Sequence, residues 1–212
     1  MNEKEILKIL IKEYGKPTTQ LIHRNPFQLM IATILSAQCT DERVNKVAPI
    51  LFKKYKTPKD FAKADLNDLK RIIKSTGYYN QKAKRLKESS KMLVEKYGGK
   101  VPESVDELVK LPGVGRKTAN IIITYGLKGN QGIAVDTHVR RVSYRLGLTE
   151  SKNPKIIEQD LMKKFNKKDW PLINSLLVWH GRKYCNARKP KCKECPLNKI
   201  CPKRGLSEAN AV

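Results

Sequence analysis

The stretch LPGVGRKTAN at residues 111–120 decides the fold of this chain. Helix-forming sequence lies on both sides of it, SVDELVKL leading into the stretch and KTANIIITYGL continuing from it. The first helix is predicted to stop at Pro112-Gly113, and the second is predicted to begin around Gly115. Because Gly113 and Gly115 can adopt backbone conformations that other residues avoid, the pattern predicts a tight helical hairpin.

The predicted hairpin has the features of an anion-binding site. Glycines let the backbone approach a ligand, and the amides at the start of the second helix favour negative charge. Gly113, Gly115 and Arg116 are therefore candidates for gripping a DNA phosphate without reading sequence. An ordinary turn between two helices is the alternative. A nucleotide-binding loop is excluded, because Arg116 separates glycine from lysine and no hydrophobic strand comes before the turn.

Helical periodicity runs along the rest of the chain. An apolar stripe at helical spacing marks the N-terminal segment, and Asn25-Pro26 supplies an N-cap and a first-turn proline. Further helices are predicted to start near Asp41, Asp65, Asn80 and Ser104, and to cover residues 137–146, 153–165 and 171–184. Only residues 132–135 have strand character, and no alternating pattern of useful length is present. The sequence therefore predicts an all-α fold.

The charge of the chain points to a polyanionic partner. Its 44 Lys and Arg residues against 20 Asp and Glu give a formal net charge of +24. A charge of this size favours nucleic acid, although charge alone does not separate DNA from RNA or an acidic membrane surface. No apolar run approaches the roughly 20 residues that span a bilayer, and the N-terminus lacks a signal-peptide cleavage pattern. We expect a cytoplasmic protein that does not enter a membrane.

The cysteines are unevenly distributed. Cys39 stands alone and is expected to be a small core residue. The other four form the segment CNARKPKCKECPLNKIC, with the spacing C-x6-C-x2-C-x5-C: Cys185, Cys192, Cys195 and Cys201. Four thiols this close together in a reducing compartment indicate a metal site rather than disulfides. The spacing alone leaves structural zinc and a 4Fe-4S cluster equally open.

Three motifs together resemble the endonuclease III family of helix-hairpin-helix DNA glycosylases. They are LPGVGRKTAN, IAVDTHVRRV and the four-cysteine segment, and their order and spacing agree over nearly the whole chain. The resemblance implies a 4Fe-4S cluster on the four cysteines, with a structural role. It also implies two helical lobes. One is a helical bundle over residues 22–131 with the hairpin at about 104–124, and the other joins residues 1–21 to 132–212.

Lys117 and Asp136 form the candidate catalytic pair. Excision with strand cleavage needs a neutral amine that attacks the sugar C1′ and forms a Schiff base. The start of a helix disfavours an ammonium at Lys117, and we expect partial burial and Arg116 to act in the same direction. A simple phosphate contact is the alternative role for Lys117. Asp136 has the pattern of a helix N-cap, and the resemblance implies that it also supports the developing sugar cation and assists proton transfer.

The remaining candidate residues are expected to contact DNA. A base inside the duplex must be flipped out before it can meet Lys117. By resemblance Gln38 enters the duplex and Tyr78 lies opposite on another loop; the alternatives are a solvent-facing helix end for Gln38 and core packing for Tyr78. Three cations between the first two cluster cysteines are expected to face the DNA backbone: Arg188, Lys189 and Lys191.

The resemblance implies base-excision repair of oxidised pyrimidines. The enzyme would be a bifunctional glycosylase that cleaves the abasic strand by β-elimination, a monomer bound to double-stranded DNA with damaged bases or abasic sites, associated with the nucleoid. Two rival functions stay open. One is a monofunctional mismatch glycosylase on the same scaffold, and the other is a non-enzymatic DNA-binding helix-hairpin-helix module.

Overall fold

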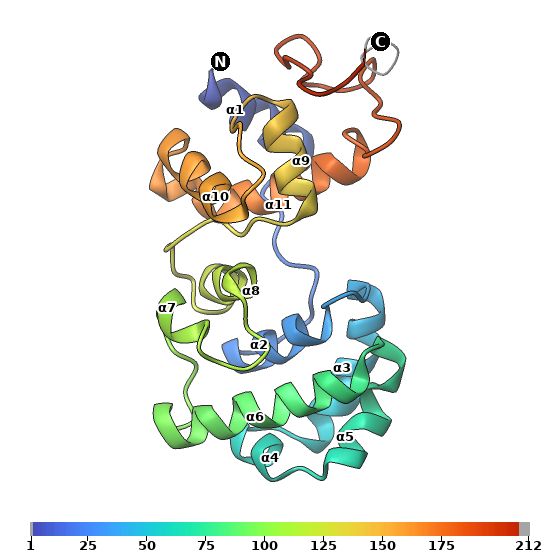
Figure 1. Ribbon diagram of the computed structural model, residues 1–212, viewed down its shortest axis with the longest axis vertical. Coiled ribbons are helices and arrows are strands. Elements are labelled where there is room, and N and C mark those ends of the chain that lie inside the picture. The colour runs from blue at the N-terminus through green and yellow to red at the C-terminus, as the bar shows by residue number, and fades with distance from the viewer. Residues whose placement is uncertain (1, 208–212) are drawn as a thin grey trace. The chain divides into compact units, whose positions relative to one another are not determined.

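The computed structural model describes residues 2–207 and is built from helices (Figure 1). No β-strand occurs within that range, so the all-α prediction is confirmed. Residues 132–135, the stretch with strand character, form an extended connection without a strand partner. None of the described helices has both the length and the apolar character needed to cross a membrane.

The chain divides into two compact units. Thr19–Gln131 forms the first, here called the hairpin unit, and Met1–Thr18 with Gly132–Val212 forms the second, here called the cysteine unit.

The hairpin unit carries the helices from α2 to η2. Their bounds are α2 Pro26–Leu35, α3 Asp41–Lys54, α4 Pro58–Lys63, α5 Leu66–Ile73, the 3-10 turn η1 Lys74–Thr76, α6 Tyr79–Tyr97, α7 Val105–Leu108, α8 Arg116–Ile121 and the π-helical turn η2 Ile122–Gly126. The long helix α6 packs against α4 and α5 (Figure 1).

Side-chain caps explain where these helices begin. Asn25 accepts a hydrogen bond from the Gln28 amide (2.8 Å), and Pro26 follows in the first turn, as predicted. Thr40 and Asp65 cap α3 and α5 in the same way. Helix α4 was not anticipated, although Thr57 and Asp60 form a capping box at its start. Its six residues are too few to produce a visible apolar period.

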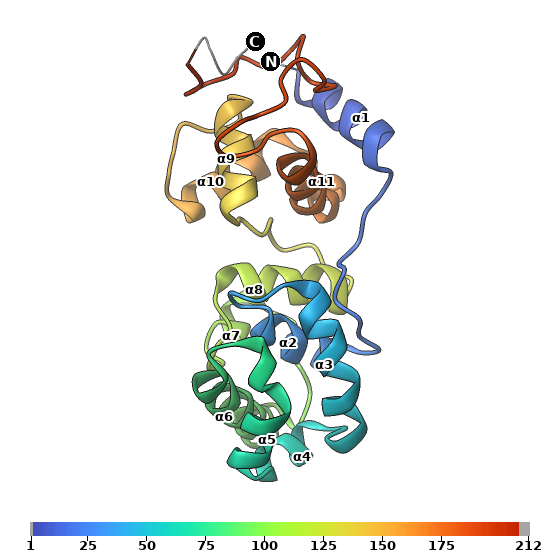
Figure 2. The ribbon, with the colours of Figure 1, turned by 90° about the vertical axis from the view of Figure 1, so that its right-hand side faces the viewer.

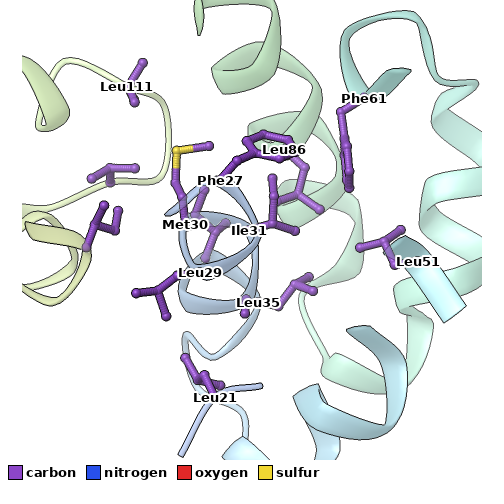
Figure 3. Packing of buried hydrophobic residues seen from close by; sticks show 14 of the residues in the cluster. Leu21, Phe27, Leu29, Met30, Ile31, Leu35, Leu51, Phe61, Leu86 and Leu111 are labelled. Atoms are coloured by element: carbon purple, nitrogen blue, oxygen red, sulfur yellow. The ribbon is translucent and has the colours of Figure 1, made fainter. Parts of the chain in front are cut away.

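Helix α2 lies at the centre of the hydrophobic core of the hairpin unit. Leu29, Met30, Ile31 and Leu35 are fully buried on different sides of this helix (Figure 3). Leu86 of α6 and Phe61 of α4 belong to the same cluster, and the Phe61 ring packs edge-to-face on Phe27 at 5.4 Å. Because α2 is apolar all round, it is enclosed rather than half-exposed.

The cysteine unit, whose helices are labelled in Figure 2, has its own hydrophobic core. Its elements are α1 Glu3–Tyr14, α9 Thr137–Arg145, α10 Pro154–Lys164, the 3-10 turn η3 Lys167–Asp169 and α11 Trp170–Lys183. Helix α11 packs against α9 and α1. The N-terminal apolar stripe contributes the buried Ile6 and Leu10, so the segment before and the segment after the hairpin unit share one core.

Asp68 anchors the connection between α3 and α5. Its carboxylate accepts hydrogen bonds from the Tyr55 hydroxyl (2.5 Å) and Arg71 (2.6 Å), and its Oδ2 lies 2.8 Å from Lys54 Nζ. Lys54, Tyr55 and Arg71 together hold the pKa of Asp68 far below its usual range.

Replacing Asp68 by Asn is expected to lower the free energy of unfolding at pH 7 by about 1–2 kcal/mol. The pKa of Asp68 is lower in the folded than in the unfolded state, so its stabilisation is complete above about pH 5 and declines as the pH falls through about 4. Urea denaturation of both proteins between pH 7 and pH 3 measures this. A stability difference that stays constant down to pH 3 would contradict the assignment.

Candidate active site

The predicted hairpin is present, with a longer connection between its two helices than the sequence suggested. Helix α7 ends at Leu108 rather than at Pro112-Gly113, and single turns continue the chain to Leu111. The Leu111 carbonyl then accepts a hydrogen bond from the Val114 amide (3.0 Å). Leu111 and Val114 are both buried. The turn is therefore fastened to the core at each end.

The two glycines of the turn have different roles. Gly113 has φ +86°, the left-handed region that favours glycine. A Cβ atom there would lie 3.1 Å from Arg85 Cδ on α6 and 3.4 Å from Ile34 Cγ2 on α2. Gly115 has an ordinary φ of −87°, and a Cβ atom there would meet nothing within 4 Å. The expectation that Gly115 needs an unusual conformation is thus wrong.

Gly115 instead leaves an open approach to the start of α8. It is the N-cap of that helix, and as a glycine it offers no side-chain cap. Arg116 and Lys117 follow in the first turn, and both are exposed. The expected partial burial of Lys117 is therefore not found. A lysine beside an uncapped helix start can contact an anion or reach a bound sugar.

Asp136 is held rigidly at the start of α9 in the cysteine unit. Its Oδ1 accepts a hydrogen bond from the Val139 amide (2.8 Å), which makes it the N-cap of the helix. This bond occupies one carboxylate oxygen and fixes the direction of the side chain. Lys117 belongs to the hairpin unit and Asp136 to the cysteine unit.

Gln38 and Tyr78 occupy two exposed loops of the hairpin unit. Both are non-glycine residues in left-handed backbone conformations, with φ 53° at Gln38 and φ 48° at Tyr78. The Tyr78 side chain is 63% exposed, so the alternative of core packing is wrong. Cys39 beside Gln38 is partly buried against the core, as expected.

The four clustered cysteines border a single cavity in the cysteine unit. All are free thiols, and Cys185, Cys192, Cys195 and Cys201 line the cavity together with apolar side chains and polar ones, Arg145 and His180 among them. Burial raises the pKa of the Cys195 thiol to about 11 and also raises that of Cys201. A set of deprotonated thiols would therefore need a cationic centre. Among residues 2–207, no group of His, Cys, Asp or Glu has the geometry of a site for a single metal ion.

N–H groups surround the sulfur atoms, which suits thiolate ligands of a metal centre. Arg145, at the end of α9, lies 3.4 Å from Cys185 Sγ and also binds the carbonyls of Asn186 (2.7 Å) and Ala187 (2.9 Å). The Lys203 amide lies 3.4 Å from Cys201 Sγ. His180 Nε2 lies 3.4 Å from Cys195 Sγ, and its Nδ1 lies 3.1 Å from the Tyr14 hydroxyl.

The residues between the first two clustered cysteines form an exposed loop. Arg188, Lys189 and Lys191 are all exposed on it, and the Lys191 amide donates to the Tyr184 carbonyl (2.8 Å) to close the loop. Arg145, which donates to two carbonyls of this loop, was not predicted from the sequence. Its place in the last turn of α9, 40 residues before Cys185, gives no signal in the sequence.

Comparison with known proteins agrees with this geometry. The model of the "HhH-GPD superfamily base excision DNA repair protein" family matches residues 31–167. Endonuclease III of Synechocystis sp. is 47% identical over 198 residues, covering 93% of this chain and 90% of the relative. Endonuclease III of Bacillus subtilis is 50% identical over 183 residues, covering 86% and 83%.

Solved structures of DNA glycosylases are also similar to this chain. A trapped covalent endonuclease III–DNA intermediate superimposes with a TM-score of 0.89 at 42% identity, covering 96% of this chain and 97% of that chain. A thermostable thymine-DNA glycosylase gives a TM-score of 0.85 at 26% identity, covering 94% and 95%.

The fold, the hairpin and the family match define an enzyme of base-excision DNA repair, a helix-hairpin-helix DNA glycosylase. More closely, the chain belongs to the endonuclease III family, whose members combine glycosylase and abasic-site lyase activities. DNA is therefore the partner that its charge of +24 indicated.

Replacing Gly113 by Ala is expected to destabilise the protein by about 1–3 kcal/mol, because of the positive φ and the contact with Arg85. Replacing Gly115 by Ala is expected to change the free energy of unfolding by less than about 0.5 kcal/mol, because its φ is ordinary and the space is open. Thermal and urea denaturation of both variants measure this. Equal destabilisation by the two substitutions would show that the two glycines do not differ in this way.

Proposed function

We propose that the enzyme removes oxidised pyrimidines from double-stranded DNA and cleaves the resulting abasic strand through a Schiff base on Lys117. The observation that carries the proposal is the exposed amine of Lys117, one residue after Arg116 in the first turn of α8 and behind a glycine N-cap. The similarity at 42% identity to an endonuclease III trapped as a covalent DNA intermediate supports covalent chemistry.

Lys117 would act in its neutral form. Its nitrogen forms a bond to C1′ while the bond from C1′ to the base breaks, and the departing base takes up the electron pair and a proton. Opening of the sugar ring leaves a Schiff base. Loss of a proton from C2′ then allows the 3′ phosphate to leave, which cuts the strand.

Asp136 would complete the reaction as the carboxylate partner. Its Oδ1 is engaged by the Val139 amide, so the carboxylate keeps its direction while Oδ2 serves the reaction. A negative charge beside the sugar supports the developing cation, and a carboxylate can transfer the protons that the steps above require. We propose that the hairpin unit and the cysteine unit are the two domains expected from the sequence, each contributing one of the two catalytic residues.

DNA would be held and opened by the other candidates. Gly113, Gly115 and Arg116 offer a phosphate contact at the hairpin, and Arg188, Lys189 and Lys191 offer cations on the cysteine loop. Gln38 and Tyr78 would fill the gap that the extruded nucleotide leaves. We propose a monomer acting on nucleoid DNA.

The four cysteines would hold a 4Fe-4S cluster as their resident group. The shared cavity, the thiol donors and the N–H groups from Arg145 and Lys203 fit such a cluster. When bound, it would supply four metal–thiolate bonds that fix the loop of Arg188, Lys189 and Lys191. Because glycosidic cleavage involves no oxidation or reduction, we assign the cluster a structural role.

Borohydride trapping tests the nucleophile. On a duplex containing thymine glycol, the native enzyme is expected to give a covalent adduct that Lys117→Ala abolishes, because the Schiff base needs that amine. Lys110→Ala, a lysine in the same hairpin that pairs with Glu107, is the matched control and keeps the adduct.

Asp136→Asn preserves an N-cap acceptor and removes the negative charge, so it is expected to fold normally and to lose about 10²-fold or more in single-turnover rate.

In the trapping experiment, an adduct that persists in Lys117→Ala would refute the assignment of the nucleophile. Base release without any adduct from the native enzyme would indicate a monofunctional glycosylase. The similarity to a thymine-DNA glycosylase is the observation that favours this alternative.

Metal analysis of anaerobically purified protein tests the cluster. Iron and inorganic sulfide are expected in equal amounts, with visible absorption that is lost in Cys195→Ser and kept in Cys39→Ser, since Cys39 lies in the hairpin unit. Stoichiometric zinc without visible absorption would overturn the cluster assignment.

A further inference from the structure

Lys82 is a buried lysine that neither the sequence motifs nor the proposed chemistry uses. It lies in the first turn of α6, and only 2% of its surface is exposed. Its ammonium donates two hydrogen bonds of 2.7 Å, one to the Leu35 carbonyl and one to the Thr76 carbonyl. Neither carbonyl belongs to α6, so a single charged group joins three elements of the hairpin unit.

The two carbonyls have equivalent places in their elements. Leu35 is the last residue of α2, and Thr76 is the last residue of η1. Carbonyls at the end of a helix lack intrahelical partners and carry partial negative charge, so a cation is a favourable cap for both.

Each carbonyl also directly precedes a loop with a candidate wedge residue. Gln38 comes three residues after Leu35, and Tyr78 comes two residues after Thr76. Both wedge residues have positive φ values, a conformation that costs free energy for a side chain with a Cβ and persists only where the surroundings impose it. By binding both carbonyls, Lys82 fixes the position of Leu35 relative to that of Thr76. The starting points of the two loops are therefore fixed relative to each other.

Burying the Lys82 ammonium costs free energy when its hydrogen bonds are left out of account. Burial lowers the pKa of Lys82, which shows that the charged form loses hydration. Both of its described hydrogen bonds go to carbonyls rather than to a carboxylate. An apolar side chain of similar length would avoid this cost but would leave the two carbonyls without this donor, so the bridge contributes geometry as well as stability.

We propose that Lys82 is a positioning residue for base extrusion. It holds the loops of Gln38 and Tyr78 at one fixed separation, so that both side chains enter the duplex together when the nucleotide leaves the stack. This inference rests on the wedge roles proposed above for those two residues. Lys82 has no part in the bond-making steps at Lys117.

The test separates extrusion from chemistry by the choice of substrate. Lys82→Met keeps the aliphatic stem and removes both hydrogen bonds. Single-turnover rates are measured on a duplex containing thymine glycol and on a single-stranded oligonucleotide with an abasic site, whose sugar needs no extrusion. Fluorescence of 2-aminopurine beside the lesion reports extrusion itself.

The matched control is Lys87→Met on the same helix. Lys87 also donates a 2.7 Å hydrogen bond to a backbone carbonyl, that of Ala64 at the C-terminal end of α4, an element that carries neither wedge residue. We expect Lys82→Met to slow the duplex reaction and the fluorescence change by about tenfold or more, because misplaced groups lose effective orientation. The single-strand reaction is expected to stay within about twofold, and Lys87→Met is expected to leave both reactions unchanged.

Three outcomes would overturn the inference. One is a duplex rate unaffected by Lys82→Met, and another is an equal loss on both substrates, which would indicate general structural damage. The third is an unchanged duplex rate in the double variant Gln38→Ala/Tyr78→Ala, which would show that these two residues do not act as wedges. Circular dichroism establishes folding at the assay temperature, and Lys82→Gln, which retains donors of shorter reach, replaces the Met variant if that variant is unfolded.

Discussion

The close packing of Gly113 against α6 and α2 is the constraint on which the hairpin unit depends. Its bare Cα lets the turn lie against Arg85 and Ile34, whose side chains a Cβ atom would approach to 3.1–3.4 Å, closer than an ordinary contact. The Leu111–Val114 hydrogen bond and the burial of both residues fasten the turn at each end. The start of α8 follows within three residues, so the position of Lys117 is determined by backbone packing rather than by contacts of its own side chain.

Helix α9 has a comparable place in the cysteine unit. Asp136 caps its first turn, and Arg145 in its last turn binds the segment that carries the clustered cysteines. The intervening residues Val139 and Val142 are fully buried in the core of that unit. One rigid helix therefore connects the candidate carboxylate to the candidate cluster, so a group that stabilises the cysteine loop would also stabilise the helix that directs Asp136.

Local sequence signals predicted the parts of the fold that local physics controls. The caps at Asn25 and Asp136 and the turn at Gly113 follow from residue type and spacing. Features that depend on distant contacts were not predictable: Arg145 reaches carbonyls about 40 positions away, and Lys82 reaches one 47 positions away. The burial expected at Lys117 was wrong for the same reason, since no local pattern reports how neighbouring helices cover a side chain.

Peptide mapping of the borohydride-reduced enzyme–DNA adduct tests the central claim most directly, because it locates the covalent bond without relying on a variant. The adduct is digested with protease and nuclease, and tandem mass spectrometry identifies the lysine that carries the sugar fragment. The account predicts the modification on Lys117 in the first turn of α8. A modification on another lysine, or on the N-terminal amine, would contradict it.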